Sequence, residues 1–216
     1  MSLVDRFRLV AFDMDGVLVD SFRCWWMLLN DTLASRGKPP LTREEFQSTW
    51  GQDVEADRRR FFPDWSVERL TRYYEERFPD YMKHVEVEPD AAMVLDRLRL
   101  RGKSLAVATN SPMGIAVPLM ENASLAARFD RIAGVDLVPQ GKPQPDLLLH
   151  IAKELGVSVE SMCYVGDSEF DAGAARAARV HFIGYRREGD TRIERLGDLL
   201  AEGVTSSTSR AAGSPR

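Results

Sequence analysis

The residues of this 216-residue chain that could do chemistry begin with a pair of aspartates. The apolar run 9–12 ends at Asp13 and Asp15, and Gly16 follows directly. Side chains alternate between the two faces of a strand, so carboxylates one residue apart converge only if the backbone bends after the strand. Gly16 permits that bend. Because ligands of open α/β sheets bind at the carboxyl ends of the strands, this pair marks a candidate active site.

Three further polar segments follow predicted strands. Thr109 and Asn110 lie on a turn whose hydroxyl, amide and backbone N–H groups suit phosphate oxygens. Lys142 stands in the loop Gly-Lys-Pro-Gln-Pro-Asp, at the start of a predicted helix. Asp167 and Asp171 belong to the segment Gly-Asp-Ser-Glu-Phe-Asp after a later strand. We expect all of them to meet the first aspartate pair at one edge of the sheet.

Several carboxylates in a partly desolvated pocket repel one another, so they require cations beside them. Lys142 supplies one cation, and a bound metal ion is the natural second. Oxygen ligands without clustered His or Cys suit a hard ion, and Mg²⁺ is favoured over Ca²⁺ because few carboxylates contribute. His84, His150 and His181 lie in three different predicted elements, which argues against zinc.

In this order, the four segments resemble the motifs of the haloacid dehalogenase-like hydrolase superfamily. Residues 13–20, Asp-Met-Asp-Gly-Val-Leu-Val-Asp, fit the first motif. The pair 109–110 is similar to the second, Lys142 in Gly-Lys-Pro to the third, and Asp167 with Asp171 to the fourth. The resemblance spans residues 8–185, and its insert after the first motif is similar to the cap of the subgroup containing phosphoglycolate phosphatase and β-phosphoglucomutase.

The resemblance implies a role for each residue. Asp13 would attack phosphorus and form an aspartyl phosphate, while Asp15 would protonate the leaving oxygen and then activate water. Thr109 and the Asn110 backbone would hold phosphate oxygens. Lys142 would neutralise both the phosphate and the nucleophile.

The implied Mg²⁺ site consists of the Asp13 carboxylate, the Asp15 backbone carbonyl and Asp167. Asp171 would orient Lys142 or a metal-bound water; the alternative is an ordinary carboxylate on a helix face. An acid at position 15 disfavours a dehalogenase, because only a phosphate ester has a leaving alkoxide that needs a proton.

Short β-rich runs predict the strands that position these segments. They are residues 9–12, 104–108, 131–133, 162–165 and 181–183. Helical patterns separate the later runs, which predicts an α/β fold with a Rossmann-like parallel-sheet core. Apolar stripes at 93–98 and 147–155, ended by Gly102 and Gly156, are typical of crossover helices.

About 90 residues separate the first two of these strands, more than one crossover needs. N-cap signals at Asp20 or Ser21, at Thr42 with Glu45, and at Ser66 predict an inserted all-helical subdomain, here called the cap, at residues 20–85. The core domain would then comprise 1–19 and 86–203, followed by a disordered tail at 204–216. We assign all four tryptophans to the cap's own core and to the face it presents to the sheet domain, rather than to an aromatic ligand cage; they are Trp25, Trp26, Trp50 and Trp65.

Composition limits the classes of partner. The chain is 44% hydrophobic and 29% charged, with a formal net charge of -4, which argues against a nucleic-acid or membrane binder. It contains no apolar run of the roughly 18 residues that span a bilayer, and residues 1–8 lack the apolar centre of a signal peptide. We therefore predict a cytoplasmic monomer or homodimer, with Cys24 and Cys163 as buried core thiols.

The leading prediction is a Mg²⁺-dependent phosphatase acting on a small-molecule phosphomonoester. A hexose phosphate mutase similar to β-phosphoglucomutase is the alternative, although the cap loop after Gly51 lacks the basic residue that those enzymes place there, and Arg58 is the nearest substitute. A non-catalytic phosphate-binding regulatory protein is a third candidate. Four cap residues are candidates for substrate contact: Arg23, Gln52, Arg58 and Lys83. The alternative for the arginines is a solvated helix face.

Overall fold

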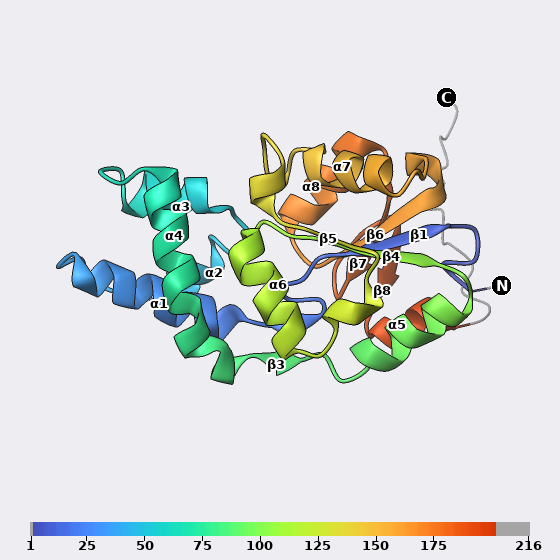
Figure 1. Cartoon of the computed structure of the whole chain (residues 1–216), viewed down its shortest axis with the longest axis horizontal. Helices are drawn as coiled ribbons and strands as arrows, with labels where there is room; N and C mark the ends of the chain where they lie inside the picture. Colours follow the sequence, from blue (N-terminus) through green and yellow to red (C-terminus); the bar gives the residue numbers. More distant parts are fainter. Residues whose placement is uncertain (1, 202–216) are drawn as a thin grey trace, which may run out of the picture.

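The computed structural model describes residues 2–201, and its centre is a six-stranded sheet between layers of helices (Figure 1). The strand order is β5-β4-β1-β6-β7-β8, and every neighbouring pair is parallel. The strands are β1 (Leu9–Phe12), β4 (Ser104–Ala108), β5 (Arg131–Ala133), β6 (Met162–Gly166), β7 (His181–Tyr185) and β8 (Thr191–Ile193). The predicted α/β fold with a parallel-sheet core is confirmed. The short edge strand β8 was not predicted.

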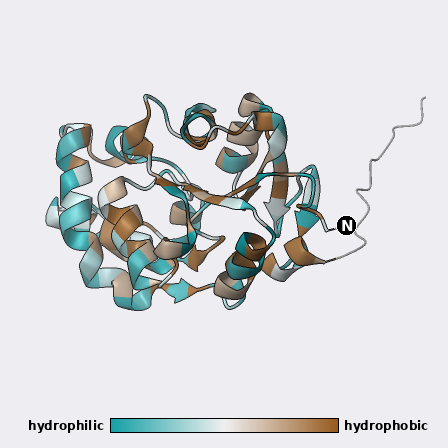
Figure 2. Ribbon diagram, turned by 45° about the vertical axis from the view of Figure 1, so that its right-hand side comes forward, coloured by the Kyte–Doolittle hydropathy of each residue, from teal (hydrophilic) through white to brown (hydrophobic). Residues whose placement is uncertain are grey.

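Both faces of the sheet are covered, which explains why its central strand β1 is apolar throughout. All four residues of β1 are buried; Val10 and Phe12 enter one hydrophobic core, Leu9 and Ala11 the other. The first core is completed by α5 (Ala91–Leu100), α6 (Met113–Asn122) and cap residues, and the second by α7 (Asp146–Glu154) and α8 (Glu169–Ala178). Figure 2 shows hydrophobic residues along the strands and hydrophilic residues toward the outside of the helices.

The path of the chain through the sheet determines where a ligand can bind. From β1 the chain builds outward through β4 to β5, then crosses back to add β6, β7 and β8 on the other side. The connections therefore diverge on either side of β1, which opens a crevice at the carboxyl ends of β1, β4 and β6. Asp13, Thr109 and Asp167 follow these three strands directly.

The cap consists of helices joined to the core by a two-stranded ribbon. Its helices are α1 (Phe22–Ser35), α2 (Arg43–Gln47), α3 (Val54–Phe61), α4 (Val67–Arg77) and the 3-10 helix η1 (Phe78–His84). The antiparallel strands β2 (Val19–Asp20) and β3 (Glu86–Val87) carry the chain in and out. Two residues per strand are too few for a sequence signal, so the ribbon was not predicted. The division into core and cap at 19/20 and 85/86 remains a prediction.

Local capping signals at α2 and α4 form the hydrogen bonds predicted from the sequence. Thr42 and Glu45 form a reciprocal capping box at α2, and the Ser66 hydroxyl accepts a hydrogen bond from the Arg69 N–H at α4. At α1 the N-cap residue Ser21 makes no side-chain capping bond, and the Asp20 carboxylate before it accepts from the Phe22 N–H at 3.1 Å. The 3-10 helices of the core are η2 (Ala126–Arg128), η3 (Val135–Leu137), η4 (Val159–Ser161) and η5 (Leu196–Leu200).

Other sequence predictions have mixed outcomes. Cys24 and Cys163 are buried free thiols, as predicted. Within residues 2–201, no helix is both long enough and apolar enough to cross a bilayer. The predicted disordered tail at 204–216 lies outside the described residues. Cytoplasmic location, oligomeric state and the lack of a nucleic-acid partner remain predictions.

Candidate active site

Asp13 continues the central strand into the crevice. Its N–H donates to the Val165 carbonyl of β6 at 2.8 Å, and only 4% of the residue is exposed. The carboxylate oxygen Oδ1 accepts from the Met14 N–H at 2.8 Å and from Lys142 Nζ at 2.7 Å. Within residues 2–201, no hydrogen-bond donor contacts Oδ2. One oxygen of Asp13 is therefore fixed, while the other is available to a ligand.

Lys142 is a buried ammonium group whose three N–H donors are all used. Nζ donates to Asp13 and to Asp171, both at 2.7 Å, and to the Tyr164 hydroxyl at 3.0 Å. The Asn110 side chain fixes the lysine backbone, accepting from its N–H at 2.8 Å and donating to its carbonyl at 3.0 Å. Burial lowers the pKa of Lys142, but the two carboxylates outweigh it and the net shift is upward. The lysine thus remains charged.

Asp171 is fully buried, and hydrogen bonds occupy both of its oxygens. Oδ1 accepts from Lys142 and from Tyr164 (2.6 Å), and Oδ2 accepts from the N–H and the hydroxyl of Ser168. Burial raises the pKa of Asp171, but Lys142 and Ser168 lower it further, so it stays ionised. Of the arrangements left open by the sequence, the structure places Asp171 against Lys142. Two of these partners were not predicted from the sequence: Tyr164, which lies inside an apolar strand, and Ser168, which is a helix N-cap.

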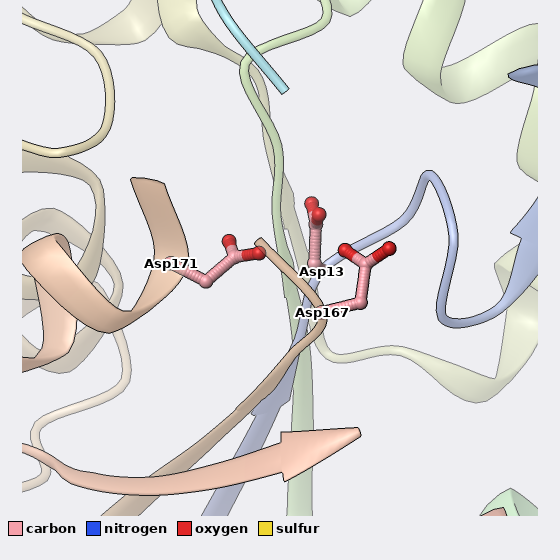
Figure 3. Close-up of side chains that lie close together, drawn as sticks. All are labelled: Asp13, Asp167 and Asp171. Atoms are coloured by element: carbon pink, nitrogen blue, oxygen red, sulfur yellow. The ribbon is translucent and has the colours of Figure 1, made fainter. Parts of the chain in front are cut away.

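Asp167 brings a carboxylate without a partner to the same place (Figure 3). Carboxylate oxygens of Asp13, Asp167 and Asp171 lie within 4.8 Å of one another. Asp167 Oδ1 is buried and has no hydrogen-bond partner in the described part of the chain. Burial, followed by the charge of Asp171, raises the pKa of Asp167 to about 7. Because Asp171 is saturated, the oxygens free for a hard divalent cation belong to Asp13 and Asp167.

Gly16 is required for this approach. Its backbone φ is +86°, and a Cβ built on it would lie 2.1 Å from Asp167 Oδ2. Any other residue would both strain the turn and displace the Asp167 carboxylate. The bend at Gly16 was predicted from the sequence, but its contact with Asp167 was not.

Asp15 is held by hydroxyl groups. Ser21 donates to Oδ1, and Ser111 and Thr109 donate to Oδ2 at 2.9 and 3.3 Å. Burial raises the pKa of Asp15, while the bonds from Ser21 and Ser111 oppose the rise. The Asn110 backbone N–H has no acceptor among the described residues, so it can serve a ligand. Ser111 belongs to the turn that the sequence analysis selected, but its bond to Asp15 was not predicted.

A cavity of about 60 Å³ lies between these residues and the cap. Its core side includes Asp13, Asp15, Thr109, Asn110, Ser111 and Lys142. Its cap side is formed by Trp25, Leu29, Phe46, Thr49, Trp50, Gly51, Gln52, Asp53, Val54 and Asp57. The Asn110 amide donates to the Gly51 carbonyl at 2.8 Å, which joins the cap loop to the core.

A family model of haloacid dehalogenase-like hydrolases matches residues 10–185. The chain belongs to this family. Phosphoglycolate phosphatase 1 of Pseudomonas aeruginosa is 34% identical over 182 residues, covering 80% of this chain and 67% of that protein. Phosphoglycolate phosphatase of Chromobacterium violaceum is 34% identical over 180 residues, covering 79% and 81%. The crystal structure of CbbY from Rhodobacter sphaeroides in complex with phosphate superposes with a TM-score of 0.78 at 25% identity, covering 89% and 96%.

The tryptophans of this haloacid dehalogenase-like hydrolase occupy both places predicted for them. Trp65 packs on Phe62 and Tyr73 inside the cap. Trp25 and Trp50 line the cavity, on the face that the cap presents to the core. That they serve packing rather than an aromatic ligand cage remains a prediction.

The four predicted substrate-contact residues of the cap separate into two groups. Gln52 lines the cavity. Arg58 does not, because its guanidinium is paired with Glu55 at 2.6 and 3.0 Å. Arg23 and Lys83 are exposed and also lie outside the cavity lining. Of the four, only Gln52 therefore lines the cavity, and substrate contact by any of them remains a prediction.

Proposed function

We propose that this chain is a Mg²⁺-dependent phosphatase that hydrolyses a small phosphomonoester through an aspartyl phosphate on Asp13. The observation that carries the proposal is the buried ion pair of Lys142 with Asp13, which fixes Oδ1 and leaves Oδ2 unpaired in a residue that lines the cavity. A carboxylate with one fixed and one free oxygen is suited to nucleophilic attack. Burial, followed by the charge of Asp171, raises the pKa of Asp13 and outweighs Lys142, so a bound cation would favour the ionised form that attacks. The similarity to phosphoglycolate phosphatases supports a phosphate ester as the substrate.

Mg²⁺ fits the residues present. The free oxygens of Asp13 and Asp167 would hold it, together with the backbone carbonyl of Asp15, and the orphaned Asp167 Oδ1 would gain a partner. When bound, the ion would screen the carboxylates from the negative charge of the incoming phosphate.

The chain's own residues account for the proton and bond changes. The Asn110 N–H and the Lys142 charge hold the phosphoryl oxygens, with Thr109 beside them. The Asp13 carboxylate attacks phosphorus, and the bond to the ester oxygen breaks as that oxygen takes the proton of Asp15. Asp15, now a carboxylate, removes a proton from water as the water attacks phosphorus. Phosphate leaves, and Asp13 is restored.

Hydrolysis is favoured over transfer to a sugar. The basic residue nearest the cap loop, Arg58, is bound to Glu55 and does not line the cavity.

Phosphate release from phenyl phosphate and 2-hydroxyethyl phosphate, with Mg²⁺ and with a chelator, tests the proposal. Asp13→Asn should abolish turnover, whereas the matched control Asp80→Asn, an exposed carboxylate of η1, should keep it. Turnover that survives in Asp13→Asn would refute the mechanism. Stoichiometric isomerisation of glucose 1-phosphate without phosphate release would favour the mutase.

A further inference from the structure

The ionisable groups around the cavity are distributed unevenly between its two sides. Of the described residues that line it, Lys142 is the only lysine or arginine, and its three donors are taken by Asp13, Asp171 and Tyr164. On the cap side, the ionisable residues of the lining are Asp53 and Asp57. The part of a substrate that lies beyond its phosphate therefore meets negative charge.

Asp57 is a carboxylate held in place by neutral partners. The Gln52 amide donates to Oδ1, and the Tyr74 hydroxyl donates to Oδ2 at 3.1 Å. The described residues include no salt-bridge partner for it. Burial raises its pKa to about 6, so it is ionised above neutral pH. A fixed, largely desolvated anion at a cavity wall favours a cation beside it.

Aromatic rings line the same side of the cavity as this carboxylate. Trp25, Phe46 and Trp50 line the cap side of the cavity. Trp25 packs edge-on against Tyr74, the same tyrosine that donates to Asp57, with ring centroids 5.7 Å apart. Aromatic faces attract organic cations, and more strongly in desolvated sites. Carboxylate and rings thus offer two complementary contacts for one ammonium group.

We propose that the preferred substrate is a small phosphomonoester whose organic part carries an ammonium group, bound by Asp57 and the aromatic wall of the cap. The proposal rests on the phosphatase function proposed above and names its substrate class. It separates this chain from its phosphoglycolate phosphatase relatives. A substrate carboxylate would face Asp53 and Asp57 with no free cation among the described lining residues, and like charges brought together at this range are strongly disfavoured.

Three esters of equal length, which differ only in the terminal group, test the charge preference. They are 2-aminoethyl phosphate, 2-hydroxyethyl phosphate and phosphoglycolate. With the Mg²⁺-loaded full chain at pH 8, kcat/KM should fall in that order, and the first should exceed the last by about 10- to 100-fold. Phosphoglycolate turned over as well as the aminoethyl ester would overturn the inference.

Removing one negative charge from the cap should reduce the preference for the aminoethyl ester over phosphoglycolate. Asp57→Asn should lower the ratio of kcat/KM for the aminoethyl ester over phosphoglycolate by about tenfold. Glu55→Gln is the matched control on the same helix; it makes the same charge change, but Glu55 pairs with Arg58 outside the cavity lining, so the ratio should stay. Asp53→Asn is a second test, because asparagine also caps α3, and it should shift the ratio in the same direction as Asp57→Asn.

These outcomes distinguish a wrong charge preference from a wrong catalytic function. If the three esters are hydrolysed at equal rates, or if Asp57→Asn and Asp53→Asn leave the ratio unchanged, the charge selection is wrong and the phosphatase stands. If neither phenyl phosphate nor any of the three esters releases phosphate, the phosphatase itself is wrong. The ratio of kcat/KM for the aminoethyl ester over phosphoglycolate, measured on the wild-type chain, tests the charge preference even if a variant fails to fold.

Discussion

Replacing Lys142 by methionine tests the electrostatic centre of the site. The ammonium group is buried, with 2% of its side chain exposed, and it makes two salt bridges of 2.7 Å and one hydrogen bond of 3.0 Å to Tyr164. Lys142→Met has nearly the same volume but no charge. It leaves Asp13 and Asp171 buried together without their shared cation.

Removing one partner of a buried ion pair costs about 3 to 5 kcal/mol, because the remaining charge is uncompensated. We therefore expect Lys142→Met to lower the free energy of unfolding by about 3 to 5 kcal/mol. At roughly 2 to 4 °C per kcal/mol for a chain of this size, Tm should fall by about 6 to 20 °C. Asp171→Asn added to this variant should recover about 1 to 3 kcal/mol, since one carboxylate is then neutral.

Urea denaturation followed by circular dichroism, at pH 7.5 with a chelator present, measures these differences. Lys153→Met is the control, because that lysine is exposed on α7 and its loss should change stability by less than about 0.5 kcal/mol. A loss below about 1 kcal/mol for Lys142→Met, or no recovery in the double variant, would refute the reasoning.

Three further predictions follow from the same contacts. Asp57 has a pKa of about 6 in the folded chain against an ordinary 3.8, so the native state loses stability as pH rises between these values. Asp57→Asn should therefore raise the free energy of unfolding by about 1 to 3 kcal/mol at pH 8 and hardly at pH 3.5, and a gain that is larger in acid would contradict this. Gly16→Ala should reduce turnover at least about 100-fold and raise the Mg²⁺ concentration for half-maximal rate, because its Cβ meets Asp167; Gly37→Ala, where φ is +64° and no atom lies within 4 Å, should not. Asp15→Asn should lower kcat for 2-hydroxyethyl phosphate by about 10²- to 10⁴-fold, while the first-turnover release of nitrophenol from 4-nitrophenyl phosphate, whose leaving group needs no proton, should change far less.

The core and its chemistry could be predicted because their signals are local. A run of apolar residues ending in Asp13 and Asp15 specifies a buried strand and a polar turn without reference to the rest of the chain. The convergence of Asp13, Thr109 and Asp167 also follows, because each comes directly after a parallel strand and such strands end at a common edge. Lys142 reaches them from the loop before α7.

The parts that could not be predicted depend on tertiary packing. Nothing in the sequence around Tyr164 distinguishes its hydroxyl, bound to Lys142 and Asp171, from that of an ordinary core tyrosine. Which face of each cap helix points toward the cavity likewise depends on tertiary packing. A basic residue in the cap is a reasonable ligand for an anionic substrate, but Arg58 finds Glu55 three residues away on its own helix, and that local pair removes it from the cavity.

The central claim is that Asp13 carries the phosphoryl group, and chemical trapping tests it most directly. The enzyme is mixed with 4-nitrophenyl phosphate and Mg²⁺, quenched in acid within the first turnovers and reduced with borohydride, which converts an aspartyl phosphate to homoserine. Peptide mass spectrometry should then find homoserine at position 13 of the wild-type chain and no modification in Asp13→Asn. Turnover with unmodified Asp13, or with the modification on another carboxylate, would contradict the account.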